Sequence, residues 1–337
     1  MHPASSRPDH TACSGCSLCL LVCPVWRQTH DIRLTPHGRA KALQHGATAV
    51  DVAASIDACT LCGACDPVCP ENIDLVAMVL DLRADLARPD RERTKPPEIS
   101  IDGEAASVAS VQVLPDQALG EDAARLARVM ELLHAVEDAC VAADSGSDIA
   151  LALAVGAEIP RERLDRFIAP LQGARRLIVG EGMLFRPLRE WLPGAHVTSL
   201  GEALSSVPEV RDRLGVDDLY VIEPRAYHAD YERLVKYYDA LRVARGCGMN
   251  LDLQRIAIPA TAAGFPARAA GDAAGNLDQA RWVIEGRNFT RIIVEDLNDL
   301  GLFKRVSDKT IVHLCELALP SRDGSARPGS GAPALGA

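Results

Sequence analysis

Apolar and polar positions alternate on two length scales in the last two-thirds of the chain. Short apolar runs bounded by polar residues predict buried strands of a parallel sheet. These runs lie at residues 149–155, 177–179, 219–222, 256–258 and 292–294. Segments with the periodicity of an amphipathic helix alternate with them, at 121–140 and 227–244. This order of strands and helices indicates an α/β architecture.

The first ninety residues have a different pattern, in which the apolar stretches are short and prolines interrupt them. Residues 36–38 predict a turn, and the periodic stretch 39–43 predicts a helix after it. Asp51 or Ser55 is a candidate start for the next short helix. Residues 75–83 predict a helix that packs on the core.

Composition sets the number and the extent of the domains. A chain of 337 residues with 48% hydrophobic content is expected to form about two or three domains with cores of their own. A charged, proline-rich stretch at 88–97 marks a linker, and the glycine-, proline- and alanine-rich end from Ser321 predicts a disordered tail. We expect an α+β fold overall with these units: a mainly α-helical domain at 1–90, a linker at 91–104, α/β repeats at 105–215 and 216–320, and a tail at 321–337.

Two parts of the α/β region resemble each other in sequence. The segment Arg176–Glu181 aligns with Arg291–Asp296, since both read Arg, then three apolar residues. Farther along, Leu200–Ala203 aligns with Leu314–Leu317. Two copies of one βα unit, each about 115 residues long, explain both matches. Chance similarity between apolar strands explains them as well, so the sequence leaves both interpretations open.

Charge and composition exclude several classes of function. The net charge of −10 and the aromatic content of 4% argue against nucleic-acid binding, which uses basic surfaces and aromatic stacking. No run reaches the roughly eighteen apolar residues that span a bilayer. The polar start, Met1 to His10, lacks the apolar core of a secretion signal. We therefore expect a cytoplasmic protein that reaches the inner membrane only through a partner, with its cysteines serving as metal ligands or reduced thiols.

Eight of the eleven cysteines form two copies of the pattern Cys-x2-Cys-x2-Cys-x3-Cys-Pro. The first copy comprises Cys13, Cys16, Cys19 and Cys23 followed by Pro24, and the second comprises Cys59, Cys62, Cys65 and Cys69 followed by Pro70. This is the ligand spacing of bacterial two-cluster ferredoxins, so it predicts two [4Fe–4S] clusters. Thiolates also select zinc. A zinc site takes four ligands in two pairs, which leaves the third cysteine and the Cys-Pro cysteine of each run without a role.

In such ferredoxins the close triplet of each run binds one cluster, and its Cys-Pro cysteine binds the other. We therefore assign the ligands crosswise: Cys13, Cys16, Cys19 and Cys69 to one cluster, and Cys59, Cys62, Cys65 and Cys23 to the second. Because each cluster draws on both runs, the two clusters are expected to lie close together. The proline after the fourth cysteine is expected to end a short helix, because proline does not continue one comfortably.

The remaining reactive side chains have simpler interpretations. Cys140, Cys247 and Cys315 have no paired spacing, so they are expected to pack as small apolar side chains. A cation near the clusters would stabilise their reduced, more negative state, and His37 and Arg39 are the candidates. The alternative for Arg39 is that it anchors the start of a helix. The chain carries no motif for a nucleotide, a flavin or a catalytic triad, so no catalytic residue is predicted.

The insertion between the two cysteine runs resembles one family of iron–sulfur proteins. It reads Cys23-Pro-Val-Trp26 and then Leu34-Thr-Pro-His-Gly-Arg39. These passages are similar to the Cys-Pro-aromatic and Ser-Pro-Arg-Gly-Arg passages of the iron–sulfur subunits of glycolate oxidase and anaerobic glycerol-3-phosphate dehydrogenase. Heterodisulfide reductase subunits and the electron carriers of dimethylglycine demethylation are similar as well. In these proteins a two-cluster domain precedes a duplicated α/β region called the CCG domain, so the resemblance implies the same layout here.

The chain departs from this family in its α/β region. It has no adjacent pair of cysteines, and Gly180–Met183 and Glu295–Asn298 stand where relatives have Cys-Pro-x-Cys. The segment Tyr227–Asp230 looks like a Tyr-His-Asp-Pro-Cys passage that has lost its cysteine. The resemblance therefore implies a degenerate CCG region that binds no further cluster.

Together these observations predict an electron-transfer subunit of an oxidoreductase complex. As the resemblance implies, the flavin and the substrate belong to a partner, a flavin-dependent dehydrogenase or oxidase. The acceptor is an electron-transfer flavoprotein, a quinone or a membrane cytochrome. One alternative is a heterodisulfide-reductase-like catalytic subunit, against which the missing cysteines argue. Another is an interaction protein in which the clusters act as structural staples or as oxygen or iron sensors.

Overall fold

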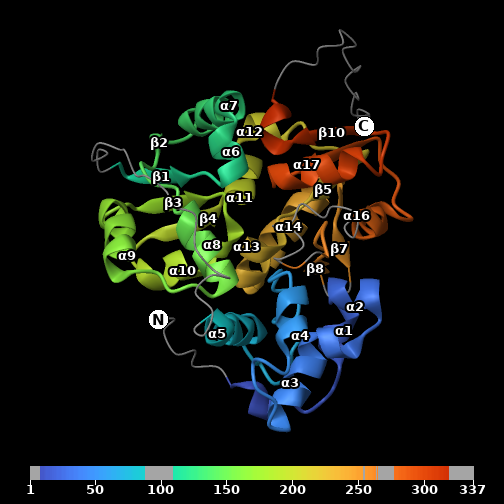
Figure 1. Ribbon diagram of the computed structural model, residues 1–337. Coiled ribbons are helices and arrows are strands. Elements are labelled where there is room, and N and C mark those ends of the chain that lie inside the picture. The colour runs from blue at the N-terminus through green and yellow to red at the C-terminus, as the bar shows by residue number, and fades with distance from the viewer. Residues whose placement is uncertain (1–7, 88–108, 253–254, 263, 265–276, 319–337) are drawn as a thin grey trace, which may run out of the picture.

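The computed structural model describes residues 8–87, 109–252, 255–262, 264 and 277–318 (Figure 1). The predicted linker at 91–104 and the predicted tail at 321–337 lie outside these residues. Residues 8–87, which we call the cluster region, lie beneath the larger α/β region, residues 109–318, in the view of Figure 1. Within the described residues, no helix has both the length and the apolar character to cross a membrane.

The cluster region consists of short helices joined by loops. Its elements are η1 (His10–Ala12), α1 (Leu18–Leu21), α2 (Pro24–Thr29), η2 (Ile32–Leu34), α3 (Pro36–Gln44), α4 (Ala53–Ala58) and α5 (Leu75–Ala87). Helix α5 confirms the packing helix predicted at 75–83. It buries Leu75, Met78, Val79 and Leu82 at helical spacing in a small apolar core that includes Ile56 of α4.

Two prolines in this region begin helices, which corrects the turn predicted at 36–38. Residues 36–38 form the first turn of α3 rather than a turn before it. Thr35 caps this helix, because its hydroxyl accepts a hydrogen bond of 3.2 Å from the Gly38 amide. Pro24 likewise begins α2, and the short helix α1 ends just before it, at Leu21. Both prolines occupy the first helical position, where the missing N–H has no intrahelical partner to lose.

The start of helix α4 was also predicted incorrectly. The helix begins at Ala53, and neither Asp51 nor Ser55 caps it. The Asp51 carboxylate instead accepts a hydrogen bond of 2.8 Å from the Thr48 amide, so it stabilises the turn before the helix.

The α/β region contains, in its described residues, two four-stranded parallel sheets with the same strand order. The first has the order β2-β1-β3-β4 and the second has the order β6-β5-β9-β10. The strands are β1 (Val111–Leu114), β2 (Ala139–Val141), β3 (Arg176–Val179), β4 (His196–Ser199), β5 (Asp218–Val221), β6 (Gly248–Met249), β9 (Arg291–Val294) and β10 (Thr310–His313). The segments that align in sequence occupy equivalent places, namely strands β3 and β9, and the helical segments that follow β4 and β10. The domain boundaries drawn from the sequence stay predictions.

Helices connect the strands and surround both sheets (Figure 1). In the first half these are α6 (Gln117–Glu121), α7 (Ala123–His134), α8 (Ser147–Val155), α9 (Arg161–Ile168), η3 (Ala169–Leu171), α10 (Gly182–Trp191), α11 (Leu200–Ser206) and α12 (Pro208–Arg211). In the second half they are α13 (Pro224–Ala229), α14 (Tyr231–Arg245), α16 (Leu277–Ile284), α17 (Leu297–Lys304) and η6 (Leu314–Glu316). Strands β7 (Leu251–Asp252) and β8 (Ile256–Ala257) form a small antiparallel pair.

Some of the predicted strands of this region are confirmed, whereas another strand and one helix were predicted incorrectly. The apolar runs at 177–179, 219–222 and 292–294 are strands of the parallel sheets, as predicted, while 256–258 overlaps β8 of the antiparallel pair. The strand predicted at 149–155 is wrong, because these residues form helix α8 between left-handed glycines at 146 and 156. Its alternating alanines and leucines favour a buried helix. The helix predicted at 121–140 is too long, since α7 ends at His134 and strand β2 follows.

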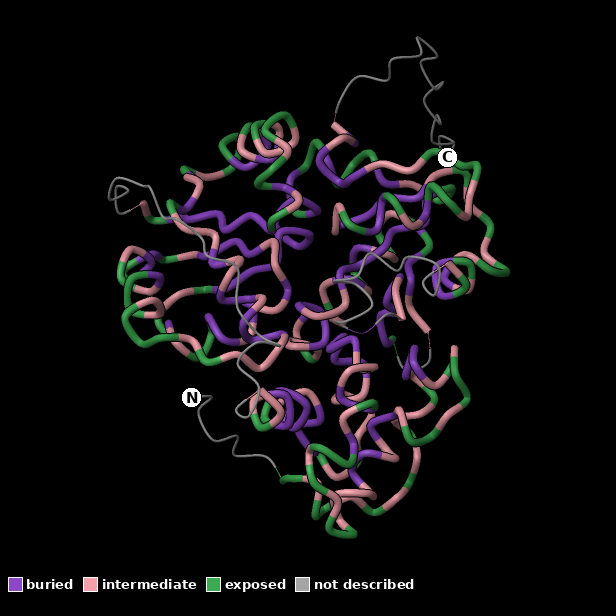
Figure 2. Tube along the Cα trace, viewed as in Figure 1, coloured by how far each residue is buried: buried purple, intermediate pink, exposed green. Residues whose placement is uncertain are grey.

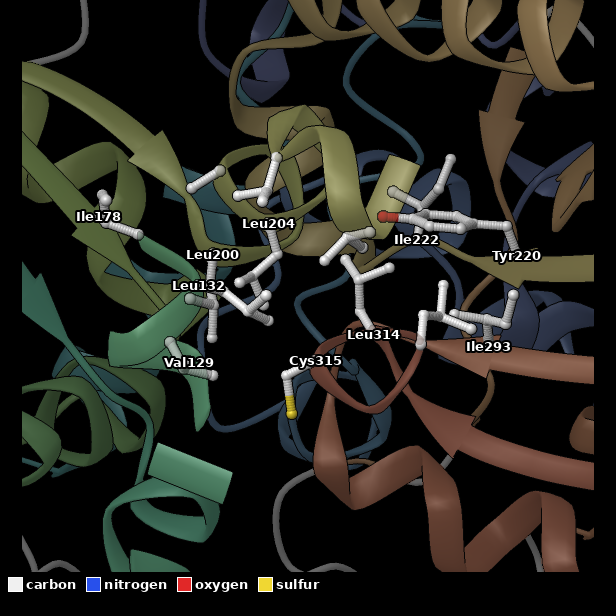
Figure 3. Packing of buried hydrophobic residues seen from close by; sticks show 14 of the residues in the cluster. Val129, Leu132, Ile178, Leu200, Leu204, Tyr220, Ile222, Ile293, Leu314 and Cys315 are labelled. Carbon is white, nitrogen blue, oxygen red and sulfur yellow. The ribbon is translucent and has the colours of Figure 1, made fainter. Parts of the chain in front are cut away.

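The two sheets share one hydrophobic core (Figures 2 and 3). Ile178 of β3 and Ile293 of β9 belong to the same buried cluster, with Leu204 of α11 and Leu314 of η6 between them (Figure 3). Close approach of the halves depends on Gly201, where a Cβ atom would lie 2.0 Å from the Glu295 carboxyl carbon. The α/β region is therefore held together by contacts between its halves as well as within them.

Candidate iron–sulfur centres

The structure gathers the eight cysteines of the two runs into two groups. The first group is Cys13, Cys16, Cys19 and Cys69, and the second group is Cys59, Cys62, Cys65 and Cys23. Burial, and then repulsion from the other three thiols of the first group, raises the pKa of Cys19 to about 12. Burial, with repulsion from Cys62 and Cys59, raises the pKa of Cys23 to about 12. Cys69 thus lies with the triplet of the other run, and so does Cys23, which is the grouping drawn from the spacing. The ligand assignment itself stays a prediction.

The two groups are neighbours. The pKa of Cys65 is raised by burial and then by the charges of Asp66 and of the thiols of its own group. Cys19 of the first group adds to this repulsion. Cys65 and Cys19 are therefore within electrostatic reach of each other, as expected if each group draws on both runs.

The two ligand loops repeat one backbone conformation. In the first run Gly15 and Ser17 have φ of +83° and +65°, and in the second run Leu61 and Gly63 have φ of +54° and +76°. These residues lie two and four positions after the first cysteine of each run. For Ser17 and Leu61 the left-handed conformation costs about 1 kcal/mol. Its recurrence at matched positions indicates that the loop wraps the same kind of group twice.

The groups differ in their exposure to solvent. Cys16 is exposed, and the apolar side chains of Leu18, Leu21 and Ile32 near the first run are 39%, 59% and 42% exposed. In the second group Cys23 and Cys62 are buried. The first group therefore lies at the surface, whereas the second is enclosed between the cluster region and the α/β region.

The second group encloses a cavity that suits a [4Fe–4S] cluster. All four of its cysteines line the cavity, together with the small residues Gly63 and Ala64 and with Arg39. Burial raises the pKa of Cys62 and Cys65, so these thiols need a bound cation to become thiolates. Four cysteine sulfurs are the usual donor set of a [4Fe–4S] cluster. Within the described residues, no three Cys, His, Asp or Glu side chains converge as they would around a single metal ion.

Comparison with known proteins gives a match in the cluster region only. Residues 9–73 match the family described as a 4Fe-4S dicluster domain. The match supports a ferredoxin-type iron–sulfur protein. It spans all eight cysteines of the two groups and the insertion between them. No curated protein and no solved structure matches the chain.

His228 of helix α13 joins the second ligand loop to the α/β region. Its Nε2 accepts a hydrogen bond of 3.2 Å from the Ala257 amide, so its Nδ1 carries the proton and donates to the Cys62 carbonyl at 2.6 Å. Burial lowers the pKa of His228 to about 4, which keeps the ring neutral. A Cβ atom at Gly63 would lie 2.9 Å from the His228 Cβ, so only glycine permits this contact.

Further contacts hold the two regions together. The Asp74 carboxylate at the start of α5 pairs with Arg186 of α10, and Arg27 of α2 stacks 3.2 Å from the ring centroid of Trp282 in α16. A cavity of about 130 Å³ lies between the regions beside the second group. Its walls include Leu61 and Gly63 of the ligand loop, Leu80 of α5, Met183 of α10 and His228.

Acidic helix caps lie within the two segments where the resemblance places Cys-Pro-x-Cys. Glu181 caps α10 and Asp296 caps α17, each by accepting a hydrogen bond from a backbone amide. Asp116 and Glu223 cap α6 and α13 at equivalent places, and burial raises the pKa of each to about 7. The half-buried Arg225 lies 3.5 Å from the Glu181 carboxylate. These side chains fix helix starts at the carboxyl ends of both sheets.

The three remaining cysteines lie outside the two groups. Cys247 and Cys315 are buried in the shared core, which confirms their predicted packing. Cys140 is half-buried in β2.

The sequence offered His37 and Arg39 as candidate cations near the clusters. It did not identify His228 as a contact of the ligand loop. His37 contacts the Ser17 hydroxyl at 3.3 Å, whereas Arg39 lines the cysteine cavity. Arg39 also lies one turn inside α3, so Thr35 and not Arg39 anchors the helix start. The Tyr-His dipeptide at 227–228 was noted as a family remnant, and its buried contact depends on tertiary packing that no local pattern encodes.

Proposed function

We propose that this chain is an iron–sulfur electron-transfer subunit that relays single electrons between a flavin-dependent oxidoreductase and a quinone, flavoprotein or membrane acceptor. The observation that carries the proposal is the pair of adjacent cysteine groups, one exposed and one enclosed. When bound, a [4Fe–4S] cluster in each group would supply one-electron redox chemistry.

The first group is suited to a protein partner. Cys16 and the apolar side chains of Leu18 and Leu21 form an exposed surface beside it. Exposed apolar side chains next to a redox site are typical of transient docking surfaces. The flavin-bearing partner would approach here.

The second group is suited to a small acceptor. The cavity of about 130 Å³ adjoins its ligand loop and has apolar walls from Leu80 and Met183. The charged side chains at its rim include two arginines and three carboxylates, Arg186, Arg225, Asp66, Asp81 and Glu190. Opposite charges in similar number favour an uncharged ring, such as a quinone head group, over a strongly charged ligand.

Anaerobically purified protein tests the proposal. It should contain about eight iron atoms per chain and show reversible one-electron reduction of two clusters by electron paramagnetic resonance (EPR). Clearly more iron would favour the disulfide-reducing alternative. Clusters that cannot be reduced reversibly, or that are lost on reduction, would contradict a relay and favour a structural or sensing role.

A cavity-filling variant tests the acceptor side. Met183→Trp should slow reoxidation of the reduced protein by a water-soluble quinone, because the larger side chain occupies the cavity. Reoxidation by ferricyanide, which can react at the exposed first group, should keep its rate. Equal rates of reoxidation by the quinone in wild type and in Met183→Trp would show that the cavity is not the acceptor site.

A further inference from the structure

Arg39 is the most deeply buried cation of the cluster region. It lies in the second turn of α3 with 1% of its surface exposed. Its Nη2 donates a hydrogen bond of 2.7 Å to the Ser55 carbonyl of α4. Within the described residues, its Nε and Nη1 have no hydrogen-bond partner. Two buried N–H donors without acceptors are costly, because a guanidinium remains charged in the protein interior.

The unpartnered donors belong to a side chain that lines the cysteine cavity. Arg39 shares the walls of this cavity with Cys23, Cys59, Cys62 and Cys65. A cubane held by four thiolates carries a net negative charge, which grows by one on reduction. A cluster bound in the cavity would therefore place a negative charge beside the Arg39 guanidinium, whose Nε and Nη1 have no acceptor among the described residues.

Arg83 shows what a purely structural arginine looks like in the same place. It is also buried, at 5% exposure. Its Nη1 donates to the Ala154 carbonyl, and its Nη2 donates to the Ile56 and Cys59 carbonyls, the latter at 2.7 Å. Arg83 thus ties α5 to α4 and α8, whereas Arg39 keeps two donors for a partner in the cavity.

The cation near the first group differs from Arg39 in its burial and in the acceptors of its donors. Lys41 is half-buried, and its ammonium donates to the Gln44 side chain at 2.6 Å and to the Cys13 carbonyl at 3.4 Å. Its charge is partly screened by water and its donors have acceptors.

We propose that Arg39 is the buried counter-cation of the second group, donating from Nε and Nη1 to the cluster held there and making that cluster easier to reduce than the first. This inference rests on the proposed function, since it assigns the second group as the electron-accepting end of the pair. Cluster potentials depend on hydrogen bonds to sulfur and on local charge, which are the two quantities that Arg39 supplies.

The test is a redox titration of the holoprotein with dithionite, followed by EPR. Arg39→Gln should lower the ratio of reduced to oxidised second cluster about ten-fold at a fixed potential, equivalent to about 59 mV for a one-electron couple. The first cluster should keep its potential. Arg39→Lys retains the charge and should shift the second cluster less.

Arg33→Gln is the matched control. Arg33 lies six residues earlier, its side chain is 84% exposed and it pairs with Asp31, so its loss should leave both potentials unchanged. Unchanged potentials in a fully loaded Arg39→Gln protein would overturn the inference. A wild-type protein whose clusters are not reversibly reducible would instead overturn the proposed function.

A measurement on the unmutated chain covers the case in which Arg39 variants do not fold. Holoprotein labelled with [15N]arginine should show a nitrogen coupling to the reduced second cluster by pulsed EPR. Labelled Arg83→Lys protein should keep this coupling, because Arg83 donates to carbonyl oxygens. A coupling absent from wild type, or lost in Arg83→Lys, would overturn the inference.

Discussion

The cluster region and the α/β region are stabilised in different ways. The apolar core of the cluster region is small, and Ala154 of the neighbouring helix α8 belongs to it. Five of its cysteines pack against that core at half-buried positions. The α/β region contains two larger clusters, one of which joins both sheets. A small region of short helices therefore depends on ligands and on its neighbour, whereas the large region depends on apolar burial.

The difference also concerns how each region uses buried charge. In the cluster region, buried arginines donate to backbone carbonyls, and one of them, Arg39, also lines the cysteine cavity. In the α/β region, buried carboxyl groups cap helices and accept hydrogen bonds from tyrosines, as Glu295 does from Tyr220 at 2.6 Å and Tyr238 at 2.7 Å. One region is organised to hold an anionic group, and the other to satisfy its own polar atoms.

The largest effect is expected from cysteine substitutions that test the crosswise grouping. Cys69→Ser and Cys16→Ser should each abolish the same cluster EPR signal, because both side chains belong to the first group. Cys62→Ser should abolish the other signal. Cys140→Ser, outside both groups, should keep both signals. A Cys69→Ser protein that loses the signal lost in Cys62→Ser would refute the grouping.

Removal of iron should destabilise the cluster region but not the α/β region. Chelation under reducing conditions should unfold much of the cluster region, because buried thiols and the Arg39 guanidinium lose their partner. Hydrogen exchange should then show loss of protection in α5 and retained protection in β3, β5 and β9. Full protection of α5 in the iron-free protein would mean that its apolar core suffices.

A rise in pH should weaken the α/β region. Burial raises the pKa of Glu295 from 4.5 to about 7, so the folded state binds a proton that the unfolded state has released. Stability should therefore fall as pH rises from about 4.5 through 7 and level off above, by up to about 3 kcal/mol at about 1.4 kcal/mol per pKa unit. Urea unfolding of wild type and Glu295→Gln at pH 5 and pH 8 measures this.

The variant should lose part of the pH dependence, and Asp116 and Glu223, whose pKa values are also raised to about 7, should supply the rest. Glu209→Gln, at an exposed position, should keep all of it. A pH dependence unaltered by Glu295→Gln would show that this carboxyl group is ionised in the folded state.

The smallest effect should come from the ion pair between the regions. Asp74→Asn removes the charge that pairs with Arg186 and should cost about 1–2 kcal/mol. Glu190→Gln removes the more exposed pair on the same arginine and should cost at most about 0.5 kcal/mol. Proteolysis between α5 and α10 at low protease concentration reports the loosening. Equal rates for both variants would show that Asp74 does not help to dock the regions.

Sequence reasoning was strongest where structure is local. The spacing within each run is local and predicted the ligand loops, whereas the crosswise grouping of the two runs was taken from the ligand pattern of two-cluster ferredoxins. The buried runs at β3, β5 and β9 were found because they are continuously apolar. Strands β4 and β10 escaped notice, since polar residues such as Thr198 and His313 interrupt their apolar pattern.

Other features depend on the tertiary fold. Helix α8 has an apolar run that fits a strand or a helix equally well, and its packing against α5 and α10 decides between them. The roles of Arg39 and His228 depend on residues 16 and 166 positions away, so no local pattern encodes them. The proline at the first position of α2 was predicted only to end a helix, although the same residue type also begins helices.

Cys69 lies beside Cys13, Cys16 and Cys19, so the first ligand set stays incomplete until the second run has left the ribosome. The second set likewise waits for Cys59, Cys62 and Cys65 to join Cys23. A nascent chain arrested between the runs would contain the four cysteines of the first run, but only three of them belong to the first set. Under the crosswise assignment, neither cluster could then gain its full ligand set before synthesis of the whole domain is complete.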